Sequence, residues 1–275
     1  MDAAAEITLT DERIIVIGDS AVGITTAQAV ADHGGQAVLT KRPGRQPSIE
    51  PRDERTEDEK HATRDERESS DTDNTASTNW GVSDDETESV ATDREQIETY
   101  DLDSTDEAAV EAFFDEIGAF DHLVCTTKHV PTGGPVETDT EALRDVFAVA
   151  FWESYYAAKY SAKHLGEGSS ITFVSGNTAT KPSVQFFAKG MANAAIETLT
   201  KYLAVEIGPV RVNAVSPGRI DALGVAEDTQ QSLADSLPAK RIGNPDDIAD
   251  AILFAITNPH TTGTVIRVDG GDLLV

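Results

Sequence analysis

Short runs of apolar residues recur along the chain, and each is bounded by glycine, proline or polar residues. The runs lie at residues 13–17, 37–40, 97–102, 121–127, 170–176, 210–218 and 263–271. Runs of this length, rich in Val, Ile and Leu, are typical of strands buried on both faces of a sheet. The pattern therefore predicts a largely parallel sheet.

Apolar residues at helical spacing fill the intervals between these runs. Val110, Phe113, Phe114 and Ile117 fall at i, i+3, i+4 and i+7, which predicts a helix with one buried face. We expect further helices at about residues 18–31, 140–165, 187–207 and 245–257. Strands that alternate with helices indicate a single doubly wound, Rossmann-type α/β domain over residues 1–275. Ligands of such domains bind at the carboxyl ends of the strands.

Capping residues mark the ends of two of these helices. Ser104 and Glu107 have the spacing of a capping box, and Gly118 is placed to end the same helix. Asn244 precedes Pro245 and Asp247, which predicts that Asn244 caps the last helix.

Residues 43–95 interrupt the alternation. This segment is rich in Asp, Glu, Arg, Ser and Thr, and Trp80 is its one aromatic residue. Such a composition buries too little apolar surface to offset the entropy of ordering. We interpret it as an acidic, disordered insertion in a surface loop, and the alternative is a partner-binding segment anchored by Trp80.

The charge balance limits the partners and the setting. The chain has 49 Asp and Glu against 22 Lys and Arg, a formal net charge of -27, which disfavours binding to nucleic acid or anionic membranes. The acidic residues are spread over the whole chain, which predicts a halophilic protein adapted to high salt; the alternative is an acidic protein of an ordinary cell. No run is long enough to span a membrane, and the single Cys125 forms no internal disulfide, so we expect a cytoplasmic protein.

The turn after the first apolar run is a candidate phosphate site. It reads GDSAVGIT over residues 18–25, with Gly18, Ser20, Gly23 and Ile24 at the start of the expected helix. Backbone N–H groups at a helix N-terminus bind phosphate, and glycines allow the close approach. Taken alone the match is weak, and a structural strand-to-helix turn is the alternative. Thr25 stands where the last glycine of a phosphate-binding turn is expected, and either Asp19 replaces the first glycine or one residue is inserted. Both departures predict weaker binding.

Several segments resemble the short-chain dehydrogenase/reductase family in their order along the chain. They are the glycine turn, Asp101-Leu102, RVNAVSPG at residues 211–218, the run from Arg241 to Ile248 and VDGG at residues 268–271. The resemblance implies hydride transfer between NAD(P)(H) and a small carbonyl or alcohol. It also places Asp101 and Leu102 at the adenine, Cys125 and Thr126 beside the cofactor, and Pro217, Gly218 and Ile220 at the nicotinamide.

The end of the second apolar run bears on the choice of cofactor. Lys41 and Arg42 follow Thr40 there, where an acidic residue would favour NAD. Cations at this position favour the extra phosphate of NADP, so the sequence predicts NADP over NAD; the alternative is a basic, solvated turn.

The resemblance also implies catalytic residues. Ser175 ends an apolar run and corresponds to the family serine that polarises the carbonyl. Lys189 and Asn193 stand where the family has its Tyr and Lys, so the usual Tyr-x-x-x-Lys pair is absent, although Tyr155 and Lys159 have that spacing on an earlier helix. A lysine with a lowered pKa serves as an acid or base, which makes Lys189 the candidate proton donor. A solvent-facing lysine is the alternative, and His129 is a second candidate.

Two functions remain open. The first is an NADP(H)-preferring oxidoreductase with an altered proton-transfer group, and the second is a catalytically silent dinucleotide-binding or regulatory protein. The resemblance implies a homo-dimer or homo-tetramer, which the aromatic residues between Phe147 and Tyr160 favour. The sequence indicates no metal site.

Overall fold

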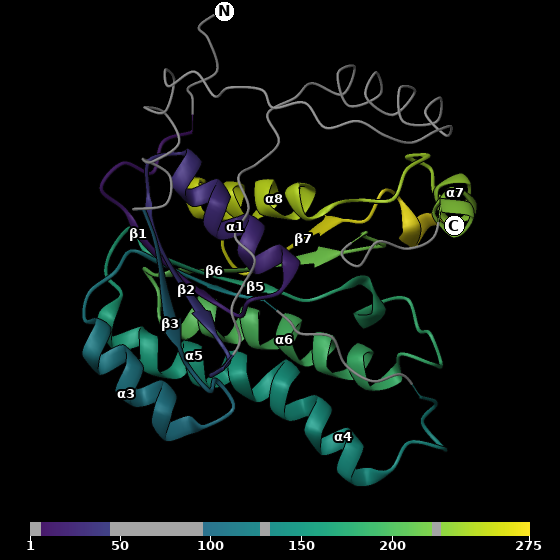
Figure 1. The fold of residues 1–275 in the computed structure, drawn as a ribbon, viewed down its shortest axis with the longest axis horizontal. Helices are drawn as coiled ribbons and strands as arrows, with labels where there is room; N and C mark the ends of the chain where they lie inside the picture. The colour runs from purple at the N-terminus through teal and green to yellow at the C-terminus, as the bar shows by residue number, and fades with distance from the viewer. Residues whose placement is uncertain (1–6, 45–95, 127–132, 222–226) are drawn as a thin grey trace, which may run out of the picture.

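One parallel sheet forms the centre of the molecule. The computed structural model describes residues 7–44, 96–126, 133–221 and 227–275. Within these ranges, seven strands pair in the order β3-β2-β1-β4-β5-β6-β7 (Figure 1), and every pairing is parallel. The strands are β1 (Arg13–Ile17), β2 (Gln36–Lys41), β3 (Ile97–Asp101), β4 (His122–Cys125), β5 (Ser170–Val174), β6 (Arg211–Pro217) and β7 (Val265–Val268). The predicted doubly wound sheet is confirmed.

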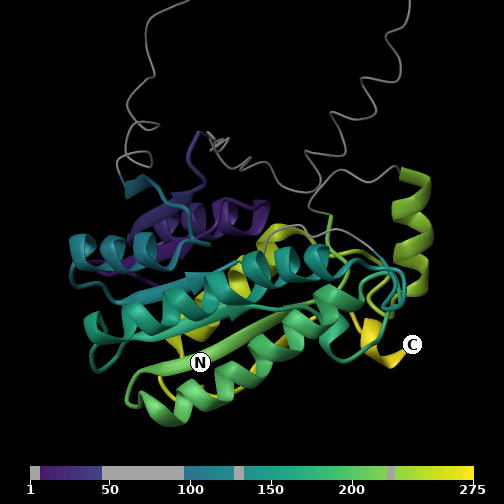
Figure 2. The ribbon, with the colours of Figure 1, turned by 90° about the horizontal axis from the view of Figure 1, so that it is seen from below.

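Helices cover both faces of this sheet (Figures 1 and 2). One face carries α1 (Ala21–Asp32) and α8 (Pro245–Thr257), and the other carries α3 (Glu107–Ile117), α5 (Glu153–Ser161) and α6 (Phe187–Glu206). Two more helices are α4 (Thr140–Phe147), beside α6, and α7 (Glu227–Ser236), beyond the carboxyl ends of β6 and β7. The helix α7 is not among the helices expected from the sequence.

Alternation along the strands explains the two-sided core. In β1, Ile14 and Val16 pack with α1 and α8, whereas Ile15 and Ile17 pack with α3, α5 and α6. These four side chains are at most 1% exposed. Successive side chains of a strand point to opposite faces, so a strand with helices above and below needs apolar residues at every position.

The helix ends agree with the sequence in part. Asn244 caps α8 by accepting from the Asp247 N–H, so the predicted cap is confirmed, and the Asp247 carboxylate in turn accepts from the Asn244 N–H. Gly118, with a φ of 73°, ends α3 as predicted. The predicted cap at Ser104 is wrong, because Asp106 accepts the hydrogen bonds from the first N–H groups of α3.

The expected long helix over residues 140–165 consists of several pieces. A π-helical segment, Ala148–Trp152, joins α4 to α5, and a 3-10 turn, Ala162–His164, ends it. A π segment places an extra residue in the turn and rotates the helix that follows it. Most of the predicted insertion, together with Trp80 and His129, lies outside the described residues, and no described helix could cross a membrane.

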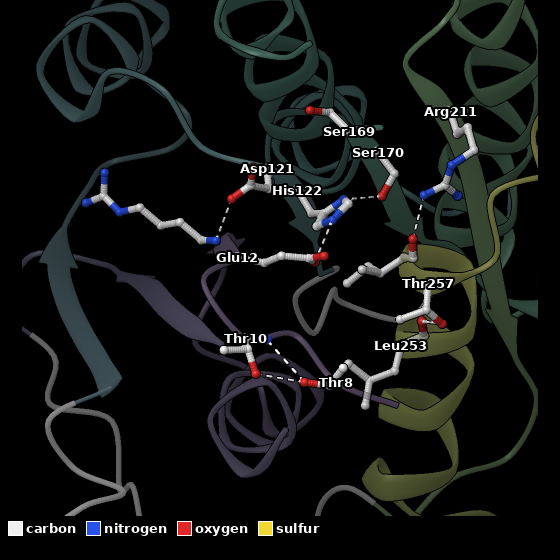
Figure 3. A network of polar contacts seen from close by, with 12 residues as sticks. Thr8, Thr10, Glu12, Asp121, His122, Ser169, Ser170, Arg211, Leu253 and Thr257 are labelled. Carbon is white, nitrogen blue, oxygen red and sulfur yellow. Dashed lines mark hydrogen bonds and ion pairs between the residues drawn. The ribbon is translucent and has the colours of Figure 1, made fainter. Parts of the chain in front are cut away.

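Polar residues are linked at the amino ends of the strands, far from the expected site (Figure 3). The ring of His122 contacts Glu12 Oε2 through Nε2 at 3.0 Å and Ser170 Oγ through Nδ1 at 2.8 Å. Arg211 donates to the carbonyl oxygens of Ala255 and Ile256 at the end of α8. We call these residues the amino-end network. It joins β4 and β5 to the segment before β1, and it joins β6 to the end of α8.

Candidate functional site

The turn between β1 and α1 is closed by two glycines. Gly18 has a φ of 104°, and a Cβ there would lie 2.7 Å from Thr126 Oγ1. A Cβ on Gly23 would lie 2.1 Å from the carbonyl oxygen of Gly18. Neither position accepts a side chain, so the two glycines let the turn pack closely against Thr126 at the N-terminus of α1.

Hydroxyl groups fasten this turn to the neighbouring strands. Ser20 caps α1 by accepting from the Gly23 N–H, and its hydroxyl lies 3.2 Å from Thr126 Oγ1. The Gly18 N–H donates to Thr40 Oγ1 at 3.2 Å. The turn is thereby held at the junction of β1, β2 and β4, where the chain order of the sheet reverses and where doubly wound domains bind their ligands.

Two residues at this turn do not face solvent freely. Asp19 is 2% exposed, so its carboxyl group lies buried beside the candidate phosphate site. Ile24 is partly buried and packs against the core on the α1 and α8 face. A buried carboxylate repels a nearby phosphate more strongly than an exposed one, because little water screens the charges.

The ends of β2 and β3 bring together two residues that were assigned to the adenosine end. Lys41 forms an ion pair with Asp101 across the paired strands. Arg42 is exposed, and Leu102 is 5% exposed and donates its N–H to the carbonyl oxygen of Lys41. Since Asp101 compensates the charge of Lys41, the guanidinium of Arg42 is the freer cation at this edge.

The two residues at the end of β4, Cys125 and Thr126, have different surroundings. Cys125 is 1% exposed, and burial together with the Glu153 carboxylate raises the pKa of its thiol well above the ordinary range. Its side chain lies in the core on the α5 face. Thr126 instead lies at the glycine turn, where its hydroxyl also reaches the carbonyl oxygen of Ile17.

The segment after β6 is fixed from two sides. Pro217 is buried, and a Cβ on Gly218 would lie 2.6 Å from the Cα of Asp269. Ile220 forms a parallel bridge with Gly243 and packs against the core. These residues, which the family resemblance places at the nicotinamide, therefore have a rigid backbone.

Three polar side chains lie in a row along α6. Lys189, Asn193 and Glu197 are spaced by four residues, so they share one face of the helix. Burial lowers the pKa of Lys189, which has no hydrogen-bond or ion-pair partner in the described part of the chain. Asn193 is 1% exposed and donates through Nδ2 to Thr178 Oγ1 at 3.0 Å.

The two catalytic candidates lie at different heights along α6. Ser175 is 3% exposed and donates from Oγ to Glu197 Oε1 at 3.2 Å. Glu197 is eight residues beyond Lys189, which is about 12 Å along an α-helix. The structure therefore does not bring the Ser175 hydroxyl next to Lys189. The residues that do lie near Lys189 include Thr178, which sequence reasoning missed because its contact with α6 is tertiary.

The Tyr155 and Lys159 pair lies elsewhere. Tyr155 stacks against Phe151 with ring centroids 6.1 Å apart. Lys159 donates to Glu107 Oε1 of α3 at 2.7 Å, and Tyr160 donates to the same atom at 2.9 Å. These contacts join α5 to α3 on the outer surface, away from the strand ends. Among the described residues, no group of three or more His, Cys, Asp or Glu side chains is arranged to hold a metal ion.

Comparisons with known proteins agree with this architecture. A family model described as enoyl-(acyl carrier protein) reductase matches residues 73–272. A short-chain dehydrogenase/reductase of Stachybotrys chlorohalonatus is 30% identical in an alignment of 193 residues that covers 64% of this chain and 75% of that protein. The chain belongs to the short-chain dehydrogenase/reductase family.

Other members of the short-chain dehydrogenase/reductase family extend the likeness. The 2-keto-3-deoxy-L-fuconate dehydrogenase of Xanthomonas campestris is 30% identical in an alignment of 201 residues that covers 67% of each chain. A solved small-chain dehydrogenase in complex with NADPH has a TM-score of 0.69 at 30% identity and covers 96% of this chain and 99% of its own. The aldohexose dehydrogenase of Thermoplasma acidophilum, at 21% identity and a TM-score of 0.75, shares the fold.

The glycine turn fits the cofactor of this family. Short-chain dehydrogenases/reductases are oxidoreductases with an NAD(P)-binding Rossmann fold. The helix N-terminus, without side chains at Gly18 and Gly23, offers backbone N–H groups to a diphosphate. The Asp19 carboxyl group is the one feature at this turn that opposes an anion.

Proposed function

We propose that this protein is an NADP(H)-preferring oxidoreductase that interconverts a small carbonyl compound and an alcohol, with Lys189 as the proton-transfer group. The single observation that carries the proposal is the environment of Lys189. Its side chain is half-buried, has no polar partner among the described residues, and has a pKa lowered by desolvation. A half-buried ammonium without a protein partner costs free energy, which favours a role for Lys189 in binding or catalysis.

The chemistry divides between cofactor and protein. When bound, a reduced nicotinamide supplies a hydride to the carbonyl carbon. The Lys189 ammonium donates a proton to the oxygen, which leaves a neutral amine and an alcohol, and solvent then reprotonates the amine. A lowered pKa favours the donation, because it makes the ammonium a stronger acid, and the amine has to regain its proton from solvent before the next turnover. The family resemblance assigned the carbonyl oxygen to Ser175, but Ser175 is 3% exposed and its hydroxyl already donates to Glu197 Oε1.

The preference for NADP rests mainly on Arg42. Its guanidinium is exposed at the end of β2, and arginine binds phosphate through two parallel hydrogen bonds. The related small-chain dehydrogenase solved with NADPH supports the same choice. Lys41 contributes less, since Asp101 already compensates its charge.

A titration followed by a turnover screen tests the proposal. The purified protein is titrated with NADPH and NADH in molar KCl by fluorescence, and NADPH oxidation is then measured with a panel of small aldehydes and ketones. Tighter NADPH binding with turnover of at least one carbonyl compound supports the oxidoreductase. Binding without turnover of any compound indicates the catalytically silent alternative, and no binding of either nucleotide overturns both.

We also propose a homo-dimer or homo-tetramer through the outer faces of α5 and α6. Aromatic residues gather there, and Trp152 is 44%, Tyr202 72% and Val205 86% exposed. Next to them, an apolar groove is lined by Phe151, Ala194, Ala195, Thr198, Leu199 and Tyr202. Light scattering tests this proposal with Tyr202→Glu, which should convert the oligomer to a monomer; a wild-type monomer overturns it.

The acidic composition supports work in a salt-rich medium. A net charge of -27 destabilises a compact chain in dilute buffer, and salt screens that repulsion. We expect the unfolding temperature to rise steeply between dilute buffer and molar KCl. Equal stability in both would contradict the proposal.

A further inference from the structure

The loop that follows β5 returns onto α6 beside Lys189. It forms a 3-10 turn, Asn177–Ala179, and Thr178 lies at its centre. A Cβ on Gly190 would lie 2.8 Å from the carbonyl oxygen of Thr178 and 3.8 Å from its Cβ. The glycine next to Lys189 therefore lets the Thr178 backbone rest directly on the helix.

A buried amide orients the Thr178 side chain. Asn193 Nδ2 donates to Thr178 Oγ1 at 3.0 Å, and a Cβ on Gly176 would lie 2.8 Å from the same nitrogen. The amide thus fills the space between Gly176 and Thr178. A hydroxyl that accepts from an amide keeps its own hydrogen to donate, and the described part of the chain offers that hydrogen no acceptor.

The hydroxyl of Ser175 differs on each of these points. Ser175 is 3% exposed, whereas Thr178 is partly exposed. Ser175 Oγ donates to the carboxylate of Glu197 at 3.2 Å and lies 3.4 Å from the carbonyl oxygen of Val215. To reach a substrate, the Ser175 hydroxyl would have to leave the partly buried carboxylate of Glu197, which is a costly exchange.

We propose that Thr178 is the catalytic hydroxyl that donates a hydrogen bond to the carbonyl oxygen of the substrate, and that Asn193 is its positioning residue. This inference rests on the proposed oxidoreductase function. In it, Thr178 of the loop after β5 and Lys189 of α6 flank one substrate oxygen. Ser175 instead joins β5 to Glu197 and has a structural role.

A matched set of variants separates the two hydroxyls. Thr178→Val keeps the shape and removes the hydroxyl, Thr178→Ser keeps the hydroxyl, and Ser175→Ala removes the other hydroxyl. With a carbonyl compound that the wild type reduces, we expect Thr178→Val to lower kcat about 10²- to 10³-fold, as loss of one oxyanion donor does. Thr178→Ser should stay within roughly tenfold of the wild type, and Ser175→Ala should stay near it. NADPH affinity and the unfolding temperature serve as controls for folding.

A double substitution tests the role of Asn193. If Asn193 acts through Thr178, Asn193→Ala lowers kcat in the wild type but adds little in the Thr178→Val background. Additive losses would show that Asn193 acts independently and would overturn its positioning role.

The outcomes also separate this inference from the proposed function. Turnover that falls in Ser175→Ala and persists in Thr178→Val overturns the assignment to Thr178 and leaves the oxidoreductase intact. A wild type that binds NADPH and reduces no carbonyl compound overturns the oxidoreductase, and the assignment of Thr178 fails with it.

Discussion

The two ends of the sheet treat buried polar groups differently. At the amino ends, the two ring nitrogens of His122 form hydrogen bonds with Glu12 and Ser170. Arg211 donates hydrogen bonds to carbonyl oxygens at the end of α8. At the carboxyl ends, neither the Lys189 ammonium nor the Thr178 hydroxyl hydrogen finds an acceptor among the described residues. Polar groups that are withdrawn from solvent normally have hydrogen-bond partners in the protein. The carboxyl end, where two such groups lack an acceptor in the described part of the chain, is therefore the end suited to a ligand.

The comparison predicts opposite costs for substitutions at the two ends. A satisfied group at the amino end contributes to stability, and its loss leaves partners unpaired in the core. A group without a partner at the carboxyl end lowers stability. Its substitution is therefore expected to lower activity without lowering stability.

The largest effect is expected for Lys189. Lys189→Met removes the proton donor and should lower kcat about 10²- to 10⁴-fold, the usual contribution of general acid catalysis. Because a desolvated charge is removed, the unfolding temperature should stay equal or rise. Steady-state kinetics and thermal unfolding measure both, and Lys201→Met, at an exposed position of α6, is the matched control. Undiminished turnover in Lys189→Met would remove Lys189 from the mechanism.

The pH dependence of stability tests the amino-end network. Burial and the charge of Arg211 lower the pKa of His122 from 6.5 to about 4. The unfolded chain therefore binds a proton first as pH falls, and stability is lost between about pH 6.5 and pH 4. At about 1.4 kcal/mol for each pKa unit, the loss is about 3 kcal/mol. Burial and Asp121 raise the pKa of Glu12, which offsets part of this loss as its carboxylate becomes protonated.

Chemical unfolding at several pH values measures the effect. His122→Asn should remove most of the pH dependence in this window, and its kcat should match that of the wild type at neutral pH. A wild type of constant stability from pH 6.5 to pH 4 would contradict the neutral, buried imidazole.

Cofactor choice sharpens the comparison at the carboxyl end. Arg42→Ala should reduce the preference for NADPH over NADH roughly tenfold, because a tenfold change in affinity corresponds to the free energy of about one charge-assisted hydrogen bond. Lys41→Ala should change it less, because the ion pair with Asp101 already engages Lys41. Fluorescence titrations of both variants with both nucleotides measure the preference. Equal losses in the two variants would mean that the ion pair opens when the cofactor binds.

The smallest effect is expected at Asp19. Its buried carboxyl group beside the phosphate turn weakens the binding of an anion. Asp19→Asn should therefore tighten NADPH binding several-fold, with no change in the ratio of NADPH to NADH affinity. Weaker binding in this variant would show that Asp19 supports the turn.

The elements of the fold could be read from the sequence because they depend on local pattern. Apolar runs such as residues 13–17 became strands, and Asn244 capped its helix as its spacing predicted. The cap of α3 was misplaced from Asp106 to Ser104, since both residues are good capping residues and only the backbone path decides between them.

The candidate site was less readable. Gly18, Gly23 and Thr126 meet at one turn, which the parallel order of β1 and β4 makes predictable. The pairing of Ser175 with Glu197 and of Thr178 with Asn193 depends on how a loop crosses a helix. Such contacts join residues that are distant along the chain and leave no periodic signal in the sequence.

The π-helical segment Ala148–Trp152 has a consequence for comparing this chain with its relatives. An α-helix turns about 100° per residue, so one residue added within it changes which side chains face inward on one flank only. Deletion of a residue from this segment would rotate one flank of the helix against the other. Either Val146 would lose its contacts with Ala188 and Ala192, or Lys159 would lose its hydrogen bond to Glu107. Alignments through this helix therefore need a one-residue gap when a relative lacks the segment, and an ungapped alignment pairs the wrong faces of α5.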